Sequence, residues 1–396
     1  MFGGVGDLAP VIIGYARTPI GSFNGALRSL SAVRLGSIAM REAVRRSGVR
    51  VEDVGEVFMG NVLSAGVGQA PATQAVIGAG LGESIPSTTV NKVCASGMKA
   101  VMFGAQALAL GQAEVVVCGG MESMSNVPHY LPNSRSGFRL GDAKLLDGCV
   151  LDGLWDPYAD QHMGKCAEML SKELNISRED QDTYAELSYE RAKVCAAYHR
   201  EHEIVAVEVA QKKGSVTISE DEEPKKGGDL TKLKPAFQKD DGTVTAGNAS
   251  SLNDGAAALV LATKKFARDR GLDVLCEIIA FADAQRDPVH FTIAPALAVP
   301  AACERAGMSH ATDVDLFEIN EAFSIVALAN AMLLDIDPVT MLNLFGGAVS
   351  LGHPIGASGA RITGSLAMAL ANGRGTTGVA AICNGGGGAS AIVLRR

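Results

Sequence analysis

Residues 90–100 read Val-Asn-Lys-Val-Cys-Ala-Ser-Gly-Met-Lys-Ala, and this stretch carries both a fold signal and a reactive side chain. A short β-branched run leads into a turn of small residues, and residues 98–110 then have the pattern of a helix. A strand that passes directly into a helix is typical of α/β folds. The segment therefore predicts that Cys94 lies in the turn, next to the N-terminus of the helix.

The stretch recurs in the second half of the chain, which indicates an internal repeat. Ala-Ser-Gly at 95–97 returns at 357–359, again with a helical pattern after it. Each copy is followed by an apolar run that ends in Cys-x-Gly, at 118–120 and at 383–385. Upstream, an Asp-Val pair precedes an Asn at 53–61 and again at 313–320. All the matches have nearly the same spacing, as expected of a duplicated unit.

Strand and helix patterns alternate in both halves. The helix over 178–198 has the clearest start, with Ser177 as N-cap and Asp180 three residues later. This alternation predicts mostly parallel sheets covered by helices. The predicted strands are 11–15, 54–60 and 316–320, and the predicted helices are 34–47, 69–80, 98–110, 178–198, 295–306 and 322–334.

A change of composition divides the chain, whose 396 residues are too many for one ordinary core. Residues 125–242 are richer in charge and loop residues than their flanks. We expect them to form an inserted loop domain that covers a site. The predicted division is an N-terminal α/β half (1–124), the insertion (125–242), a return to the N-terminal half (243–274) and a C-terminal α/β half (275–396).

Charge and cysteine usage exclude several classes of protein. The net charge of −8 argues against a nucleic-acid binder. The eight cysteines contain no C-x-x-C pair and no signal peptide is evident, which favours the cytoplasm, or the mitochondrial matrix if a presequence was removed.

Residues 57–82 are uncharged and long enough to span a membrane, but they contain Asn, Gln, Pro and several Gly. We expect them in the protein core and predict no membrane segment.

Four segments carry the candidate chemistry: the Cys94 turn, Asn320-Glu-Ala-Phe, the glycine-rich loop 346–359 around His353, and Cys383-Asn-Gly-Gly-Gly-Gly. Taken singly, each has a structural explanation, because a cysteine is often a small core residue and glycine often serves turns. The repeat places them together at the carboxyl ends of strands, where α/β ligand sites lie. Two thiols, an imidazole and exposed N–H groups form a set for acyl transfer. A metal site would need further Cys or His ligands at close spacing.

The position of Cys94 also predicts its reactivity. The N-terminus of a helix favours an anion, and it can lower the pKa of a thiol from about 8.5 to between about 3.5 and 7.5. We therefore expect Cys94 to be a nucleophile.

These four motifs resemble those of the thiolases, and the resemblance covers nearly the whole chain. Residues 161–164 and 245–255 are most similar to the acetoacetyl-CoA type within that family. The resemblance implies a five-layered αβαβα fold built from two related α/β halves with an inserted loop domain. It also implies a homotetramer, assembled as a dimer of dimers.

The same resemblance implies roles for the site residues. His353 resembles the base that takes the proton of Cys94, and Cys94 then carries the acyl group. Cys383 resembles the second acid/base, and Asn320 the residue that holds a water at the enolate oxygen. The N–H groups of Cys94 and Gly385 would form an oxyanion hole.

Further positions resemble ligand contacts. His162 and Met163 correspond to an acyl pocket in which Met163 limits chain length, Ser250 to a contact with the pantetheine of coenzyme A, and Phe291 to a pocket residue. No tightly bound cofactor is implied, since coenzyme A and acetyl-CoA are substrates. Some relatives bind potassium, and the matching positions are Tyr158, Ala246, Gly247, Ala249 and Val349.

The leading hypothesis is an acetyl-CoA C-acetyltransferase that condenses two acetyl-CoA molecules reversibly. The alternatives are a degradative 3-ketoacyl-CoA thiolase of broader chain length and a non-catalytic acyl-CoA-binding protein. A decarboxylating ketoacyl synthase usually has His or Asn at the position of the second thiol, and Cys383 argues against it.

Overall fold

Two sheets of matching strand order form the framework of the computed structural model, which describes residues 5–310 and 312–396. The first four residues of the predicted N-terminal half thus lie outside the described part. One hydrogen-bonded path runs β4-β3-β5-β12-β1-β13-β16-β15-β14, with β2 beside β12. The strands are β1 (Pro10–Arg17), β2 (Gly21–Ser22), β3 (Glu56–Gly60), β4 (Ser87–Val90), β5 (Val115–Ser123), β12 (Asn253–Thr263), β13 (Cys276–Gln285), β14 (Leu316–Ile319), β15 (Thr377–Asn384) and β16 (Gly388–Arg395).

The path is a mirrored repeat, which confirms the duplication seen in the sequence. Reading outward from the β1–β13 junction, β12, β5 and β3 correspond to β16, β15 and β14. The pair β3–β5 is parallel, as is β14–β15, whereas β5–β12 and β15–β16 are antiparallel. Strand pairing between the two halves consists of a short β1–β13 ladder, at Val11–Glu277 and Ile12–Cys276.

The expectation of mostly parallel sheets was wrong. Strand β16 follows β15 after only residues 385–387, and so short a connection joins only antiparallel strands. Strand β12 lies between β1 and β5 and is antiparallel to both. The sheets are therefore mixed.

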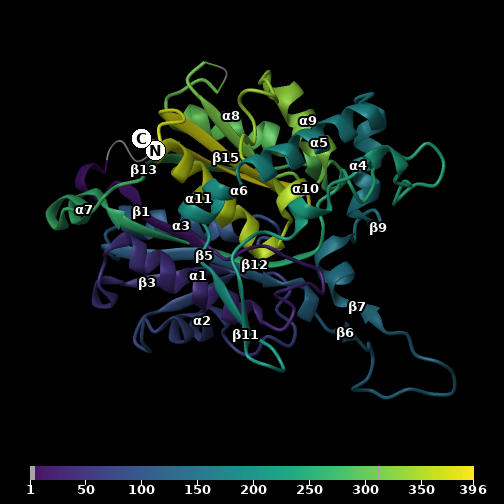
Figure 1. Cartoon of the computed structure of the whole chain (residues 1–396), viewed down its shortest axis with the longest axis horizontal. Helices are drawn as coiled ribbons and strands as arrows, with labels where there is room; N and C mark the ends of the chain where they lie inside the picture. Colours follow the sequence, from purple (N-terminus) through teal and green to yellow (C-terminus); the bar gives the residue numbers. More distant parts are fainter. Residues whose placement is uncertain (1–4, 311) are drawn as a thin grey trace.

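Helices complete five layers, which Figure 1 shows stacked from bottom to top. Helices α1 and α2 cover the outer face of the first sheet, α3 and α11 fill the space between the sheets, and α8 and α9 cover the second sheet. Three apolar clusters fill the spaces between the layers: one under the outer helices of each sheet, and one around α3 and α11 between the two sheets. The helices of these layers are α1 (Ala32–Ser47), α2 (Pro71–Ala79), α3 (Ser96–Ala109), α8 (Pro295–Arg305), α9 (Ser324–Leu334) and α11 (Ile355–Ala371), with the shorter α7 (Lys264–Arg270) and α10 (Ala348–Leu351).

The repeated Ala-Ser-Gly segments pack against each other where α3 and α11 cross. A methyl group on Gly97 would lie 2.8 Å from the backbone N of Ala360, and one on Gly359 would lie 2.5 Å from the backbone N of Met98. The contacts are reciprocal, as in an interface with two-fold symmetry. Only glycine allows the two backbones to come this close.

Residues 125–242 form small elements that pack against both halves, since Val207 and Val209 join the cluster under α1 and α2, and Tyr184 joins the cluster under α8 and α9. Their strands make three two-stranded sheets: β6 (His129–Tyr130) with β7 (Leu146–Asp147), β8 (Trp155–Asp156) with β9 (Gln161–His162), and β10 (Val207–Ala210) with β11 (Ser215–Ile218). Their helices are α4 (Met163–Glu173), α5 (Arg178–Val194) and α6 (Ala196–His202).

A buried ionic cluster fastens this segment to β1. The Nε of Arg17 donates to Glu203 at 2.7 Å, and its Nη1 donates to Asp221 at the same distance. The guanidinium is 1% exposed. Since a buried charge is stable only when it is paired, this cluster fixes the position of the segment.

Most of the predicted elements are confirmed, and three details are corrected. The capping box of Ser177 and Asp180 does begin α5, but that helix ends at Val194 and α6 resumes after Cys195. Helix α4 was not predicted. Residues 57–82 are only partly core, because the loop between β3 and α2 is largely exposed. No helix in the described ranges has both the length and the apolar character needed to cross a membrane.

The crossing of α3 and α11 gives the first prediction. Alanine inside a helix is normally better than glycine by about 0.5–1 kcal/mol, so propensity alone would make Gly359→Ala stabilising. We expect destabilisation by about 1–3 kcal/mol instead, since the methyl group overpacks against Met98. Thermal unfolding of the variant would measure this. Gly228→Ala is the matched control, because a Cβ there meets no atom within 4 Å, and a Gly359→Ala protein as stable as this control would contradict the packing argument.

Candidate active site

One cavity of about 390 Å³ receives side chains from both halves and from the insertion. The N-terminal half contributes Cys94, the C-terminal half His353 and Gly385, and the insertion His162 and Met163. Most of its wall is apolar. A concave apolar site with a few converging polar groups is the usual form of a small-molecule site.

Cys94 lies in a constrained turn between β4 and α3. The preceding Val93 has φ of +48°, a left-handed conformation that is uncommon for a β-branched residue. The hydroxyl of Ser96 stabilises the turn, because it donates to the carbonyl of Val93 at 2.6 Å and accepts from the N–H of Lys92 at 2.8 Å. The turn thereby directs the thiol of Cys94 into the cavity.

The expected depression of the thiol pKa was wrong. Burial raises the pKa of Cys94 to about 11, although hydrogen bonds from the N–H groups of Gly385 and of Cys94 itself act in the opposite direction. Desolvation of a thiolate in this apolar wall outweighs the two donors. In the free protein the group is therefore a thiol, and ionisation must be coupled to reaction.

His353 lies just before α11 and presents one free ring nitrogen. Its Nδ1 lies 2.6 Å from the Oγ of Ser358, and that hydroxyl donates to the carbonyl of Pro354 at 3.1 Å. Since the hydroxyl proton is used by Pro354, Nδ1 carries the ring proton and Nε2 has the lone pair. Nε2 is buried and has no hydrogen-bond partner among the described residues. Burial lowers the pKa of His353 to about 3, and the charge of Arg361 on α11 lowers it further, so the ring is neutral at pH 7.

Cys383 is the next-to-last residue of β15 and is fully buried in the apolar cluster that also contains Met163 and Phe291. Burial raises the pKa of its thiol, and the nearby sulfur of Cys94 raises it further. Residues 385–387 then form the turn to β16, in which Gly386 and Gly387 have positive φ. This glycine turn exposes the N–H of Gly385 beside Cys94.

Asn320 follows β14 and is 1% exposed. Its backbone N–H donates to Ala381 at 3.0 Å, which ties it to β15. Both polar atoms of its side chain are buried and have no partner within the described part of the chain. A buried amide normally has partners, so this side chain is suited to a ligand or a bound water.

Two buried glutamates hold the loops of the site, and the sequence analysis gave neither a role. Glu122 accepts from the N–H groups of Val62, Leu63 and Gly356, and burial raises its pKa to about 7 against these bonds. It thus joins the end of β5 to the start of α11. The sequence signal for this role of Glu122 was a carboxylate at the end of an otherwise apolar strand.

Glu321 has the same function next to Asn320. Its carboxylate is fully buried and accepts from Tyr184 at 2.9 Å, from Ser188 at 2.8 Å and from the N–H of Val349 at 3.1 Å. These bonds join the insertion to the loop that leads to His353.

The predicted pocket residues also meet at the cavity. His162 stacks on Phe237, with ring centroids 4.8 Å apart, and Met163 and Phe291 are almost fully buried in the wall. Ser250 lines the cavity as well, but its hydroxyl donates to the carbonyl of Ala322 at 2.9 Å.

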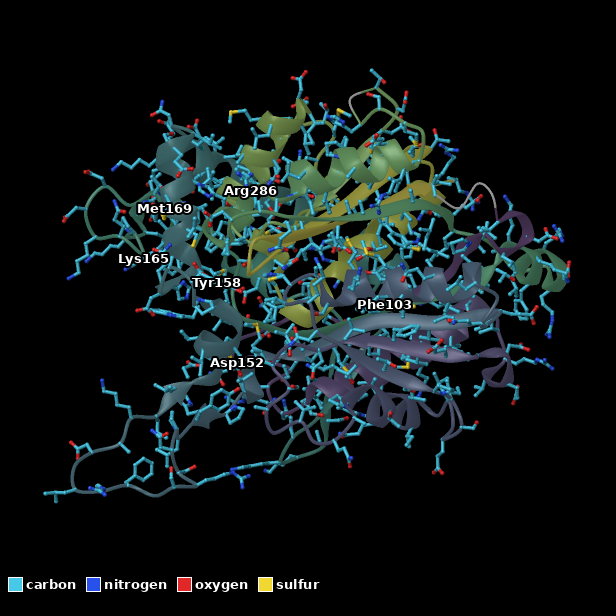
Figure 2. All side chains as sticks on the ribbon, turned by 180° about the vertical axis from the view of Figure 1, so that it is seen from behind. Phe103, Asp152, Tyr158, Lys165, Met169 and Arg286 are labelled. Carbon is cyan, nitrogen blue, oxygen red and sulfur yellow. The ribbon has the colours of Figure 1, made fainter. Side chains whose placement is uncertain are left out.

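Four of the five positions matched to potassium ligands, Ala246, Gly247, Ala249 and Val349, have no polar side chain, so a cation there could bind only their carbonyl groups. A methyl group on Gly247 would contact Leu230, which also packs with the buried Val349, and Ala246 and Ala249 line the cavity. The side chain of Tyr158 is 74% exposed, in the turn between β8 and β9 (Figure 2). We therefore derive no step through potassium.

Comparison with known proteins agrees with this geometry. The family models described as "Thiolase, N-terminal domain" and "Thiolase, C-terminal domain" match residues 10–265 and 272–396. The chain is 54% identical to acetyl-CoA acetyltransferase 1 of Arabidopsis thaliana, over 97% of this chain and 93% of the relative. It is 55% identical to the mitochondrial acetyl-CoA acetyltransferase B of Xenopus laevis (98% and 91%) and 50% identical to a cytosolic one of Gibberella zeae (98% of both).

A solved structure is also similar to this chain. The thiolase Acat5 of Ascaris suum, in complex with coenzyme A, superposes with a TM-score of 0.92 at 43% identity, over 98% of this chain and 100% of the other.

The ionisation of Cys94 gives the second prediction. Below a pKa of about 11, the thiolate fraction rises tenfold per pH unit, so alkylation of Cys94 by iodoacetamide accelerates about 100-fold between pH 7 and 9. We expect no step near pH 6.5, because His353 stays neutral above its low pKa. Mass spectrometry of the Cys94 peptide measures the rate, with Cys94→Ser as the blank. A rate that levels off below pH 8 would overturn this assignment.

Proposed function

The chain belongs to the thiolase family, and we propose that it is an acetyl-CoA C-acetyltransferase in which Cys94 carries the acyl group. The reaction joins two acetyl-CoA molecules to acetoacetyl-CoA and coenzyme A, and thiolysis is its reverse. One observation carries the assignment of the site: Cys94, the N–H of Gly385 and the unpaired Nε2 of His353 meet in one cavity, with Cys383 against Cys94.

In the first half-reaction the sulfur of Cys94 attacks the thioester carbonyl of acetyl-CoA. The pKa values of Cys94 and His353 disfavour a free thiolate–imidazolium pair, so the proton moves to Nε2 as the C–S bond forms. The N–H groups of Cys94 and Gly385 donate hydrogen bonds to the developing oxyanion. His353 then returns the proton to the departing sulfur of coenzyme A, which leaves acetyl-Cys94.

In the second half-reaction Cys383 loses its thiol proton to solvent once another acetyl-CoA is bound, and the resulting thiolate takes an α-proton from that acetyl-CoA. The enolate carbon attacks the acetyl group on Cys94, a C–C bond forms, the Cys94 sulfur leaves, and it recovers its proton from Cys383. The unpartnered amide of Asn320 and Nε2 of His353 support stabilisation of the enolate oxygen, the first through a bound water. In thiolysis the same steps run backwards, with Cys383 as the acid.

The pocket supports a short acyl group. Met163 lines the cavity, and its sulfur would lie 3.8 Å from a Cβ placed on Gly385. A long acyl chain on Cys94 would therefore meet the Met163 side chain. This favours the acetoacetyl-CoA type over the alternative thiolase of broader chain length, and the polar atoms of the cavity argue against a non-catalytic acyl-CoA-binding protein.

Assembly and compartment are further parts of the proposal. The loop between β6 and β7 projects far from the body of the molecule (Figure 1) and exposes Phe138, Leu140 and Leu145. Exposed apolar side chains on such an extension favour contact with other subunits, which supports a homotetramer. All eight cysteines are free, which suits the cytoplasm and equally the mitochondrial matrix, and the names of some relatives contain the word mitochondrial. We also keep the four-part domain division as a proposal, supported by the separate small sheets of residues 125–242.

Covalent trapping tests the mechanism. Incubation with acetyl-CoA should add one acetyl group to the Cys94 peptide, and Cys94→Ala should abolish the adduct. Cys383→Ser should lower turnover about 10²–10⁴-fold while acetylation of Cys94 continues, because only the second half-reaction needs this acid/base. An adduct that persists in Cys94→Ala, or equal loss of acetylation in Cys383→Ser, would remove this division of roles.

The acyl pocket gives a further prediction. Met163→Ala should raise kcat/KM for thiolysis of 3-ketohexanoyl-CoA relative to acetoacetyl-CoA by about 10–200-fold, the range expected when a pocket gains room for extra methylene groups. Met169→Ala is the control, because this methionine lies on the same helix and is 39% exposed (Figure 2). Equal substrate profiles for the two variants would show that Met163 does not limit chain length.

A further inference from the structure

Lys92 lies two residues before Cys94, but its side chain is bound to the other half of the molecule. We propose that Lys92 is a positioning residue, which holds the Asn384–Gly385 turn so that the N–H of Gly385 points at the sulfur of Cys94. The inference rests on the proposed function only in taking Cys94 as the nucleophile.

The contacts of Lys92 converge on the β15–β16 hairpin. Its Nζ donates to Oδ1 of Asn384 at 3.0 Å, to the hydroxyl of Ser390 at 3.1 Å and to the carbonyl of Ala389 at 3.4 Å. The amide of Asn384 in turn donates to the carbonyl of Gly385 at 2.8 Å. One side chain of the Cys94 turn thus controls the backbone that supplies the oxyanion donor.

An acidic partner keeps the ammonium in this position. Asp283 on β13 lies 3.3 Å from Nζ of Lys92 and 2.5 Å from Nζ of Lys99, and it accepts from the hydroxyl of Ser390 at 2.6 Å. Burial lowers the pKa of Lys92, and Asp283 acts in the opposite direction. An ammonium has three N–H donors, and all of them find acceptors here. The side chain is therefore fixed.

The backbone of Lys92 is fixed as well. Its N–H donates to Ser96, and the next residue, Val93, has the left-handed φ described above. Such a conformation persists only where the surroundings determine it, and it is common at functional sites. Cys94 is thus held from one side by Ser96 and from the other by the bridge from Lys92 to the Gly385 turn.

This bridge acts on the thiol through a hydrogen bond. The N–H of Gly385 lowers the pKa of Cys94, whereas burial and the Glu122 carboxylate raise it. The imidazoles of His162 and His353 also line the cavity, and the thiol of Cys383 lies near that of Cys94. If the Gly385 turn moves, the thiol loses this donor in the free protein and in the transition state. Replacing a lysine that only stabilised the fold would change neither the pKa of Cys94 nor the stabilisation of the transition state.

The test compares Lys92→Met with Lys99→Met. Both variants remove a lysine that pairs with Asp283, but only Lys92 contacts Asn384. We expect Lys92→Met to slow acetylation of Cys94 by about 10–100-fold, as misplacement of a donor does, with a smaller change in KM. The pH profile of Cys94 alkylation should also move to higher pH. Lys99→Met should match the unmodified protein within about twofold in both measurements.

A double-mutant cycle with Asn384→Ala shows whether Lys92 acts through Asn384. The two single losses should not add in the double variant, because both remove the same bridge. Should Lys92→Met fail to fold, Lys92→Gln keeps a donor and is expected to recover part of the rate. Additive losses, an unchanged alkylation profile or equal effects of Lys92→Met and Lys99→Met would each overturn the proposal. If Cys94 of the unmodified protein is not acetylated by acetyl-CoA, the proposed function is refuted. Alkylation of Cys94 needs no acetyl-CoA, so its pH profile would still test the role of Lys92.

Discussion

The contact on which the rest of the structure depends is the backbone crossing of α3 and α11 between the two sheets. Cys94 lies before one helix and His353 before the other, so the crossing determines how far apart the nucleophile and the base lie. The glycines at the crossing bring the helices together, and Gly120 on β5 allows the carbonyl of Gly356 to approach the sheet. With side chains at these positions the helices would separate, and the two catalytic loops would separate with them.

Buried polar groups then set the finer geometry. Glu122 joins β5 to the start of α11, Glu321 joins α5 to the loop before His353, and Lys92 joins the Cys94 turn to Gly385. Each group connects segments that belong to different halves or to the insertion. Because a buried polar group is stable only with all its partners in place, these connections favour one relative position of the loops. The site is preorganised by polar links at its edge and by apolar packing beneath it.

The sequence alone predicted what depends on local pattern. Ser177 and Asp180 are three residues apart, so the start of α5 could be predicted, and the repeat of Ala-Ser-Gly placed Cys94 and His353 in comparable positions. Prediction from the sequence failed for properties that depend on residues far away along the chain. The pKa of Cys94 was predicted in the wrong direction because burial depends on walls supplied by other segments. Lys92 and Asn384 are 292 positions apart, and no local pattern marks their contact. No local pattern shows either that Tyr158 is exposed to solvent, because its exposure depends on where the β8–β9 turn lies in the folded protein.

The resting site carries little charge, and this property suits the chemistry. Both thiols are protonated and the imidazole is neutral, since burial disfavours the ionised form of all three. A permanent thiolate would need a counter-ion that could also attract water to the acyl-enzyme. Here charge develops only when a thioester is in place, at the carbonyl or enolate oxygen, where N–H donors are already fixed. Since such donors are worth most in a site without bulk water, the apolar wall that raises the thiol pKa values also strengthens the stabilisation of the transition state.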